Sequence, residues 1–294
     1  MAESPAHRFG QIIGEVLEAA IEPLLAEFAQ KHSLYLDKKG ERPCRPGKKC
    51  SWLDRNGNKH DLDYVLERGG TRTKLGIPAA FIETAWRRYT KHSRNKAQEI
   101  QGAIGPLVET YKSAGPFTGV ILAGVFTKGA LTQLESLGFT VLYFPYETVV
   151  AVFGEFGIDA AFNEKTPDAD FQEKVDAYEA MPAYQRSALA RGLLEAHQDG
   201  VTRFMASLEK VVLRQIERII VLPLHGTSAE LTTVDDAIKF INDYNDKTGN
   251  APLERYEIQV RYNNGNVIEG KFKDKASAVE FLRAYQPLPP AKLK

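Results

Sequence analysis

The chain has 294 residues, of which 43% are hydrophobic, 26% charged and 10% aromatic. This length suits one large domain or two, and the composition excludes a disordered or collagen-like polymer. Lysine plus arginine and aspartate plus glutamate number 38 each, which argues against a uniformly basic nucleic-acid coat. No apolar run approaches the roughly 18 residues of a membrane span, and the first residues lack a signal-peptide pattern. We therefore expect a cytoplasmic protein that does not enter a membrane.

Charge is unevenly distributed along the chain, although it sums to zero. Residues 37–59 include eight basic and three acidic side chains, residues 84–96 include five basic and no acidic ones, and residues 155–179 are mainly acidic. Chance clustering on a solvated surface can explain one such run, whereas two basic runs near the same strands favour a surface that faces an anion. Cys44 and Cys50 lack the second pair of a structural zinc site, so we expect free thiols.

The first half of the chain alternates predicted helices and strands. Apolar residues at three- and four-residue spacing predict a long helix over 7–30. Strands over 51–53 and 59–66 flank an Asn-Gly step that is typical of a tight hairpin. This order predicts an α/β fold with a mixed sheet flanked by helices. The remaining elements expected here are a buried strand over 79–83, a helix over 93–113, a strand over 119–126, a helix over 129–137 and a strand over 139–144.

The second half is first helical and then mixed, which suggests the domain boundaries. We predict a core over 1–146, a helical region over 147–212 and a small α+β domain over 213–294 that serves as a recognition or dimerisation module. No internal repeat is apparent in the sequence. The last domain is expected to contain a strand over 216–223, a helix over 234–244, a hairpin of strands 255–262 and 267–272, and a helix over 276–285.

Two acidic residues lie at the ends of predicted strands. Alternation places Asp61 and Asp63 on one face of the strand over 59–66, and Glu83 ends the following apolar strand. If these strands are neighbours, Asp63 and Glu83 can share a hard cation such as Mg²⁺, which takes oxygen ligands. Such an ion activates water and neutralises charge on a phosphate. The alternative is that both are ordinary strand-end acids that face solvent.

This arrangement resembles the PD-(D/E)XK nuclease superfamily, which includes many type II restriction endonucleases. The resemblance covers roughly residues 7–145 and rests on the order of elements and on the acids Asp63 and Glu83. It implies a restriction-endonuclease-like core that hydrolyses double-stranded DNA with Mg²⁺, and a homodimer that cuts both strands. The superfamily motif Glu-X-Lys is incomplete here, because Ala85 follows Glu83-Thr84. The other interpretation is therefore an inactive, DNA-binding subunit of a defence or repair complex.

The resemblance also implies roles for residues around the two acids. Lys96, in the first turn of the next predicted helix, is the expected substitute for the missing lysine, with Arg87 and Lys91 as rivals. Glu18, four residues after Gly14, is a candidate further metal ligand or a solvated helix acid. Trp86 and Tyr89 could stack on a base or belong to the core, and Gln98 could orient a phosphate. DNA phosphates should meet Arg87, Arg88, Lys91 and Arg94, together with Lys48 and Lys49 on a mobile loop over 38–49.

Overall fold

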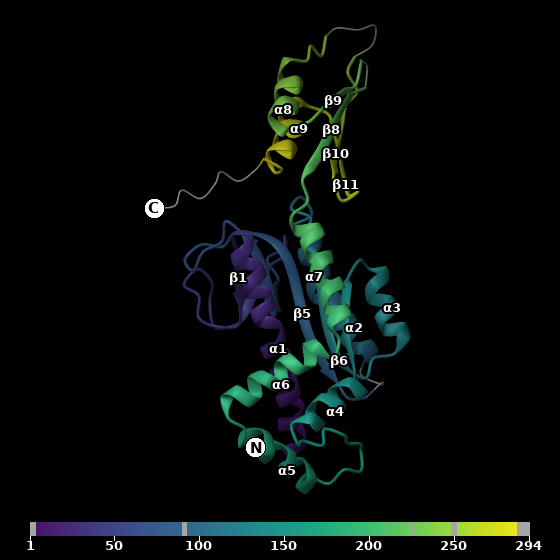
Figure 1. Ribbon diagram of the computed structural model, residues 1–294. Coiled ribbons are helices and arrows are strands. Elements are labelled where there is room, and N and C mark those ends of the chain that lie inside the picture. The colour runs from purple at the N-terminus through teal and green to yellow at the C-terminus, as the bar shows by residue number, and fades with distance from the viewer. Residues whose placement is uncertain (1–3, 90–92, 225, 248–251, 287–294) are drawn as a thin grey trace. The chain divides into compact units, whose positions relative to one another are not determined.

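The computed structural model describes residues 4–89, 93–224, 226–247 and 252–286 (Figure 1). The chain divides into two compact units. The first consists of Met1–Thr110 and Pro116–Leu208, and the second of Tyr111–Gly115 and Glu209–Lys294. Most of the helical region expected over 147–212 therefore belongs to the first unit. None of the helices in the described part of the chain combines the length and apolar character that crossing a bilayer requires.

The first unit is built on a five-stranded mixed sheet in the order β1-β4-β5-β6-β7. Neighbouring strands are antiparallel from β1 to β5 and parallel from β5 to β7. The predicted α/β fold, with a mixed sheet flanked by helices, is confirmed at this level. The strands are β1 Leu34–Lys38, β4 Tyr64–Arg68, β5 Ile77–Arg87, β6 Phe117–Gly124 and β7 Thr140–Pro145; the helices are α1 Pro5–Lys31, α2 Ser93–Thr110, α3 Lys128–Ser136, α4 Tyr146–Glu155, α5 Asp168–Glu179, α6 Ala183–Glu195 and α7 Gln198–Val212, the last of which extends into the second unit.

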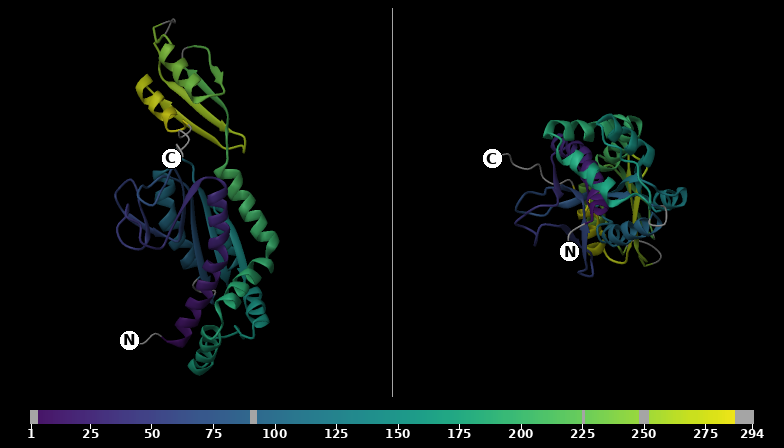
Figure 2. Two further views of the ribbon diagram at one scale, coloured as in Figure 1. Left: turned by 60° about the vertical axis from the view of Figure 1, so that its left-hand side comes forward. Right: turned by 90° about the horizontal axis from the view of Figure 1, so that it is seen from below.

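Helix α1 forms because its start is capped and one side of it is continuously apolar. The Ser4 hydroxyl accepts a hydrogen bond from the His7 amide, and Pro5 occupies the first turn, where an amide hydrogen would have no helical partner. The buried side packs along β1 and β5 of the sheet (Figure 2), and its Phe9 ring contacts Phe153 of α4 and Phe171 of α5.

Strand β5 presents alternate side chains to helices on its two faces. A Cβ on Gly10 of α1 would lie 3.9 Å from the indole nitrogen of Trp86, whose ring centroid is 6.2 Å from that of Tyr146 on α4. The next residue, Arg87, faces α2, where its Nη2 lies 3.7 Å from Glu99 Oε2. Because helices cover both faces, β6 is buried along almost its whole length.

The predicted strand over 59–66 is wrong as a single element. The chain bends at Asp63, so that β3 Lys59–Leu62 pairs with β2 Cys50–Leu53 in a separate two-stranded sheet, while β4 enters the large sheet. Asp61 and Asp63 therefore do not share one strand face. The predicted strand end at Glu83 is also wrong, because β5 continues to Arg87 through parallel pairing with β6.

The expectation of a DNA arm over 38–49 needs correction, because two of its arginines are buried in an ion-pair network. Arg42 Nη1 lies 2.9 Å from Asp37 Oδ2 and 2.5 Å from Glu67 Oε1, and Arg45 Nη2 lies 3.2 Å from Asp37 Oδ1. All four side chains are at most 2% exposed. The two arginines neutralise the two acids, so they anchor the loop to the sheet and are turned away from solvent.

The second unit is a four-stranded antiparallel sheet with two helices packed on one face. Its strand order is β11-β10-β8-β9, and one hydrophobic core joins the sheet to both helices. The elements are β8 Ile216–Pro223, β9 Ala229–Leu231, α8 Val234–Asp243, β10 Tyr256–Tyr262, β11 Val267–Phe272 and α9 Lys275–Arg283.

The second unit contains an internal repeat, which corrects the expectation from the sequence. Each half is a hairpin followed by a helix, and the helix caps Thr233 and Asp274 are 41 positions apart. The central strands have the same spacing, because Ile219 of β8 pairs with Val260 of β10. The two halves are therefore related by an approximate twofold axis at this pair. Helix positions that match across the repeat are Ala237 and Ala278, Phe240 and Phe281, Ile241 and Leu282, and Tyr244 and Tyr285.

Candidate functional site

The candidate site lies where β4 and β5 separate. Their pairing extends only from Arg68 and Ile77 to Tyr64 and Ile82. At the next position the chain turns away, and Asp63 Oδ2 accepts hydrogen bonds from the backbone N and the Oγ1 of Thr84, each at 2.7 Å. The bend therefore replaces continued strand pairing with a fixed carboxylate beside β5.

Asp63 and Glu83 are brought together, as the sequence predicted. Glu83 is 7% exposed, and its pKa is raised to about 8, first by burial and then by the charge of Asp63. A hydrogen bond between the two carboxyl groups also raises it, whereas the Lys96 ammonium opposes the change. With its pKa near 8, the Glu83 carboxyl keeps its proton at neutral pH, because burial and the neighbouring Asp63 disfavour a second negative charge.

The residues at this position fit a divalent cation. Carboxylate oxygens are the ligands that Mg²⁺ prefers, and Mg²⁺ needs only one or two carboxylates when water and phosphate supply the rest. A cation would also take the place of the Glu83 proton. Glu18 lines one cavity together with Asp63, and the pKa of Glu18 is raised by loss of solvent and by the Asp63 charge. Among the described residues, however, no group of three or more acids, histidines or cysteines is gathered as metal ligands.

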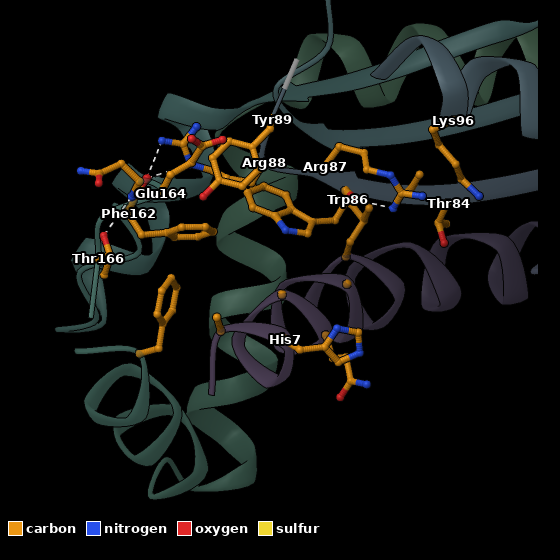
Figure 3. Close-up of a pocket in the computed structure, with 18 of the residues that line it drawn as sticks. His7, Thr84, Trp86, Arg87, Arg88, Tyr89, Lys96, Phe162, Glu164 and Thr166 are labelled. Atoms are coloured by element: carbon orange, nitrogen blue, oxygen red, sulfur yellow. Dashed lines mark hydrogen bonds between the residues drawn. The ribbon is translucent and has the colours of Figure 1, made fainter. Parts of the chain in front are cut away.

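Two cations lie beside the acid pair. Lys96, on α2, is 19% exposed at its side chain, and its Nζ lies 3.6 Å from Glu99 Oε2. Arg87 shares the same Glu99 partner, and its Nη1 donates to the Trp86 carbonyl oxygen at 2.8 Å. Figure 3 shows Lys96 and Arg87 at the same end of the cavity as Thr84. Strand β5 carries no lysine between Glu83 and Arg87, because Ala85 occupies that position. The ammonium group near the acids is therefore that of Lys96, on helix α2.

A cavity of about 750 Å³ extends from this cluster along β5 and α1. Figure 3 shows Trp86 between the end with Lys96 and the end with Phe162 and Glu164. The α1 wall includes Gly10 and Gly14, which leave helix backbone uncovered. The far wall is a loop between α4 and α5, which had no predicted role.

Arg88 holds that loop in place. Its Nε donates to the Phe162 carbonyl oxygen at 2.9 Å, and its guanidinium carbon lies 4.0 Å from the centroid of the Tyr146 ring. The Phe162 amide in turn donates to Tyr146 Oη at 2.9 Å. Arg88, predicted to contact DNA, therefore shapes the cavity wall through bonds inside the protein.

Apart from Tyr89, the other residues predicted to meet DNA lie away from the cavity or outside the described residues. Lys48 and Lys49 are exposed and pair with Glu41 at 3.6 Å and Asp61 at 2.7 Å. Arg94 and Gln98 are exposed on α2, and Tyr89 lines the cavity with Trp86. Lys91 belongs to residues 90–92, which the structure does not describe.

Comparisons with known proteins leave this site to be interpreted on its own geometry. No protein-family model matches the chain, and no curated protein matches it. A solved structure titled "Crystal Structure of Protein of Unknown Function AF1548" is 11% identical, with a TM-score of 0.26, over 64% of this chain and 98% of that one. A TM-score this low carries no argument about fold or activity.

The raised pKa of Glu83 predicts that stability falls as pH rises. Between its ordinary value of 4.5 and about 8, the unfolded chain has lost the Glu83 proton while the folded chain keeps it. The free energy of unfolding therefore falls as the pH rises through this window, and it stops falling above about pH 8. The substitution Glu83→Gln keeps a hydrogen-bond donor toward Asp63 and removes the titration.

We expect E83Q to be more stable than the wild type at pH 9 by about 3 kcal/mol, with little difference at pH 4. Urea unfolding in EDTA at both pH values measures this. Glu27→Gln, at an exposed acid on α1, is the control. If the stabilities of the wild type and E83Q changed in parallel between these pH values, the raised pKa of Glu83 would be contradicted.

Proposed function

We propose that the protein is a Mg²⁺-dependent endodeoxyribonuclease that hydrolyses phosphodiester bonds in double-stranded DNA, in the manner of a type II restriction enzyme. The observation that carries this proposal is that Thr84 holds the Asp63 carboxylate next to the buried Glu83 carboxyl, at the end of the cavity that Lys96 also lines. A buried acid that keeps its proton beside a second carboxyl is suited to exchange that proton for a metal ion, and the adjacent cation is suited to a phosphate.

Each residue has a distinct task in the proposed reaction. Asp63 and Glu83 would hold the ion, which supplies positive charge for the phosphate and a more acidic water. The two hydrogen bonds from Thr84 keep one Asp63 oxygen in a fixed direction, so the site is organised before substrate arrives. Lys96 would stabilise negative charge on the attacking water or the phosphate oxygens, and Arg87 would bind the neighbouring phosphate.

Two further parts of the proposal concern the partners. Exposed cations on α2 and on the loop over 38–49, namely Arg94, Lys48 and Lys49, would contact phosphates away from the cut. Cleavage of both strands at a symmetric sequence would require two copies of the site, hence a homodimer. Within each copy the chemistry would be the same in-line attack.

An inactive, DNA-binding subunit is the second candidate, favoured by one observation. Ala85 is buried at the strand position where the superfamily motif has lysine, and its side chain brings no charge to the acids. The nuclease candidate requires Lys96 to contribute to cleavage. The effect of a Lys96 substitution on cleavage therefore distinguishes the two candidates.

Cleavage of plasmid DNA tests the proposal and the role of Lys96 together. With Mg²⁺ the wild type should nick and linearise plasmid, EDTA should abolish cutting, and sequencing of the ends should give one recurrent position. Lys96→Ala should slow cutting by about 100-fold, because it removes a charge from the transition state. Arg94→Ala, on the exposed side of the same helix, should slow it far less. Duplex binding without cutting under any divalent ion would leave the inactive subunit as the better interpretation.

A further inference from the structure

The cavity beside the acid pair is larger than the proposed reaction needs. The ion and the scissile phosphate would occupy the end with Asp63 and Lys96, whereas the cavity of about 750 Å³ continues past Trp86 to Phe162 and Phe171. These two phenylalanine rings are in contact, with centroids 5.0 Å apart. The far end is therefore an aromatic compartment that opens into the candidate active site.

The α1 side of the cavity is lined by two glycines inside a long helix, Gly10 next to Trp86 and Gly14 one turn nearer Glu18. Glycine costs about 1 kcal/mol relative to alanine in a helix interior. A Cβ on Gly14 would meet no atom within 4 Å, and one on Gly10 would make an ordinary contact with Trp86 at 3.9 Å. Packing inside the protein does not require glycine at either position. The missing side chains instead leave open space along the α1 side of the cavity.

The opposite wall is held by hydrogen bonds within the protein and carries polar groups. Arg88 and Tyr146 hold Phe162 through hydrogen bonds and ring contacts, and Asn163 N donates to Thr166 Oγ1 at 2.9 Å in the same loop. Flat aromatic surfaces flanked by amide, hydroxyl and carboxyl groups suit a planar heterocycle that has both an apolar face and a polar edge. A nucleobase has this chemistry, and base stacking on an aromatic side chain contributes about 1–3 kcal/mol.

We infer that this compartment, lined by Gly10, Trp86, Phe162 and Phe171, binds one unstacked nucleobase of the substrate strand next to the scissile phosphate. The inference rests on the proposed function for the identity of the substrate. The phosphate lies with Lys96 and Arg87, and its base enters between Trp86 and the Phe162 wall. The enzyme thus takes a base out of the duplex stack to read it, at a cost that the aromatic contacts offset.

Tryptophan fluorescence tests the compartment without cleavage and without knowledge of a recognition sequence. The protein has two tryptophans. Trp52 is 3% exposed in the core, whereas Trp86 lines the cavity. Full-length protein in EDTA is titrated with each of the four deoxynucleoside 5′-monophosphates, up to about 10 mM because a single nucleotide binds weakly. We expect saturable quenching by at least one nucleotide, and its loss in Trp86→Phe.

The discriminating variant fills the α1 side of the compartment. Gly10→Leu places its side chain beside Trp86, where the added Cβ would make an ordinary contact at 3.9 Å, and it raises helix propensity. The variant should fold and lose at least 10-fold in nucleotide affinity. Gly102→Leu, at an exposed glycine of α2 with open surroundings, should bind as the wild type does. Thermal unfolding of both variants checks that they are folded.

The outcomes separate this inference from the nuclease proposal. Quenching that is absent with all four nucleotides, or that is equal in the wild type and Gly10→Leu, overturns the base compartment. Plasmid cleavage in that case would leave the nuclease intact. Saturable quenching that Gly10→Leu removes supports the compartment, and if no divalent ion then produces cleavage, the nuclease proposal alone fails.

Discussion

Replacement of Asp63 by asparagine should abolish plasmid cleavage, with a loss of at least about 1000-fold. The substitution removes one charge of the pair that would hold the ion, and it leaves a side chain of nearly the same size to accept hydrogen bonds from Thr84. Because Asp63 and Glu83 are the two carboxylates expected to hold the ion directly, the remaining ligand does not compensate for the loss of either. The measurement is the initial rate of nicking with Mg²⁺ under single-turnover conditions.

The neighbouring aspartate provides a matched control. Asp61 lies two positions earlier, on β3, where its carboxylate accepts hydrogen bonds from Lys49 Nζ at 2.7 Å and Ser51 Oγ at 2.5 Å. Asp61→Asn makes the same chemical change outside the cavity, so cutting should remain within a few-fold of the wild type. Equal, metal-independent cutting by the wild type and D63N would remove Asp63 from the mechanism.

Disruption of the buried ion-pair network should destabilise the first unit by about 3–5 kcal/mol. In Arg42→Met, the fully buried Glu67 loses its bidentate partner, and Asp37 keeps only Arg45. Removal of one partner from a buried pair is costly, because the remaining charge has already lost its hydration. Urea unfolding followed by tryptophan fluorescence measures this change, since Trp52 packs edge-on against Phe81, 6.2 Å between centroids, in the same unit.

A second pair on the same loop provides the comparison. Lys48 and Glu41 are 3.6 Å apart and mostly solvent-exposed, so Lys48→Met should change stability by at most about 1 kcal/mol. If Arg42→Met yields too little folded protein, the double variant Arg42→Met/Glu67→Leu should recover much of the loss, because it leaves no unpaired Glu67 charge. An Arg42→Met variant within 1 kcal/mol of the wild type would show that the network contributes little.

Local patterns were sufficient to predict most elements and the meeting of the two acids, but they did not reveal where the strands separate. Leu62 and Tyr64 are both apolar, so the segment reads as one continuous strand. The bend between them depends on Thr84, 21 residues later, whose hydrogen bonds hold the Asp63 carboxylate. Strand β1 was missed for a related reason, since its Asp37 is buried only because arginines pair with it.

Local patterns also failed to reveal the role of Arg88 and the wall of the cavity, because both depend on contacts between residues far apart in the chain. Arg88 stands in a basic run, which indicates a surface that binds anions, yet its guanidinium is directed to the Phe162 carbonyl, 74 residues away. No local periodicity signals that a loop between two helices will close a cavity beside β5. Lys96 was placed correctly near the acids because helix α2 follows β5 after a short connection, so chain order alone constrains its position.

The twofold relation within the second unit limits how that unit can be divided. Each half contributes one helix and one hairpin, and the hydrophobic core is complete only when β8 and β10 lie together. A fragment that ended after α8 would therefore expose the inner edge of β8 and the apolar side of its helix. Two such fragments could pair edge to edge in the geometry that the intact chain uses internally. Shortened forms of the protein that retain one half should therefore associate through this edge.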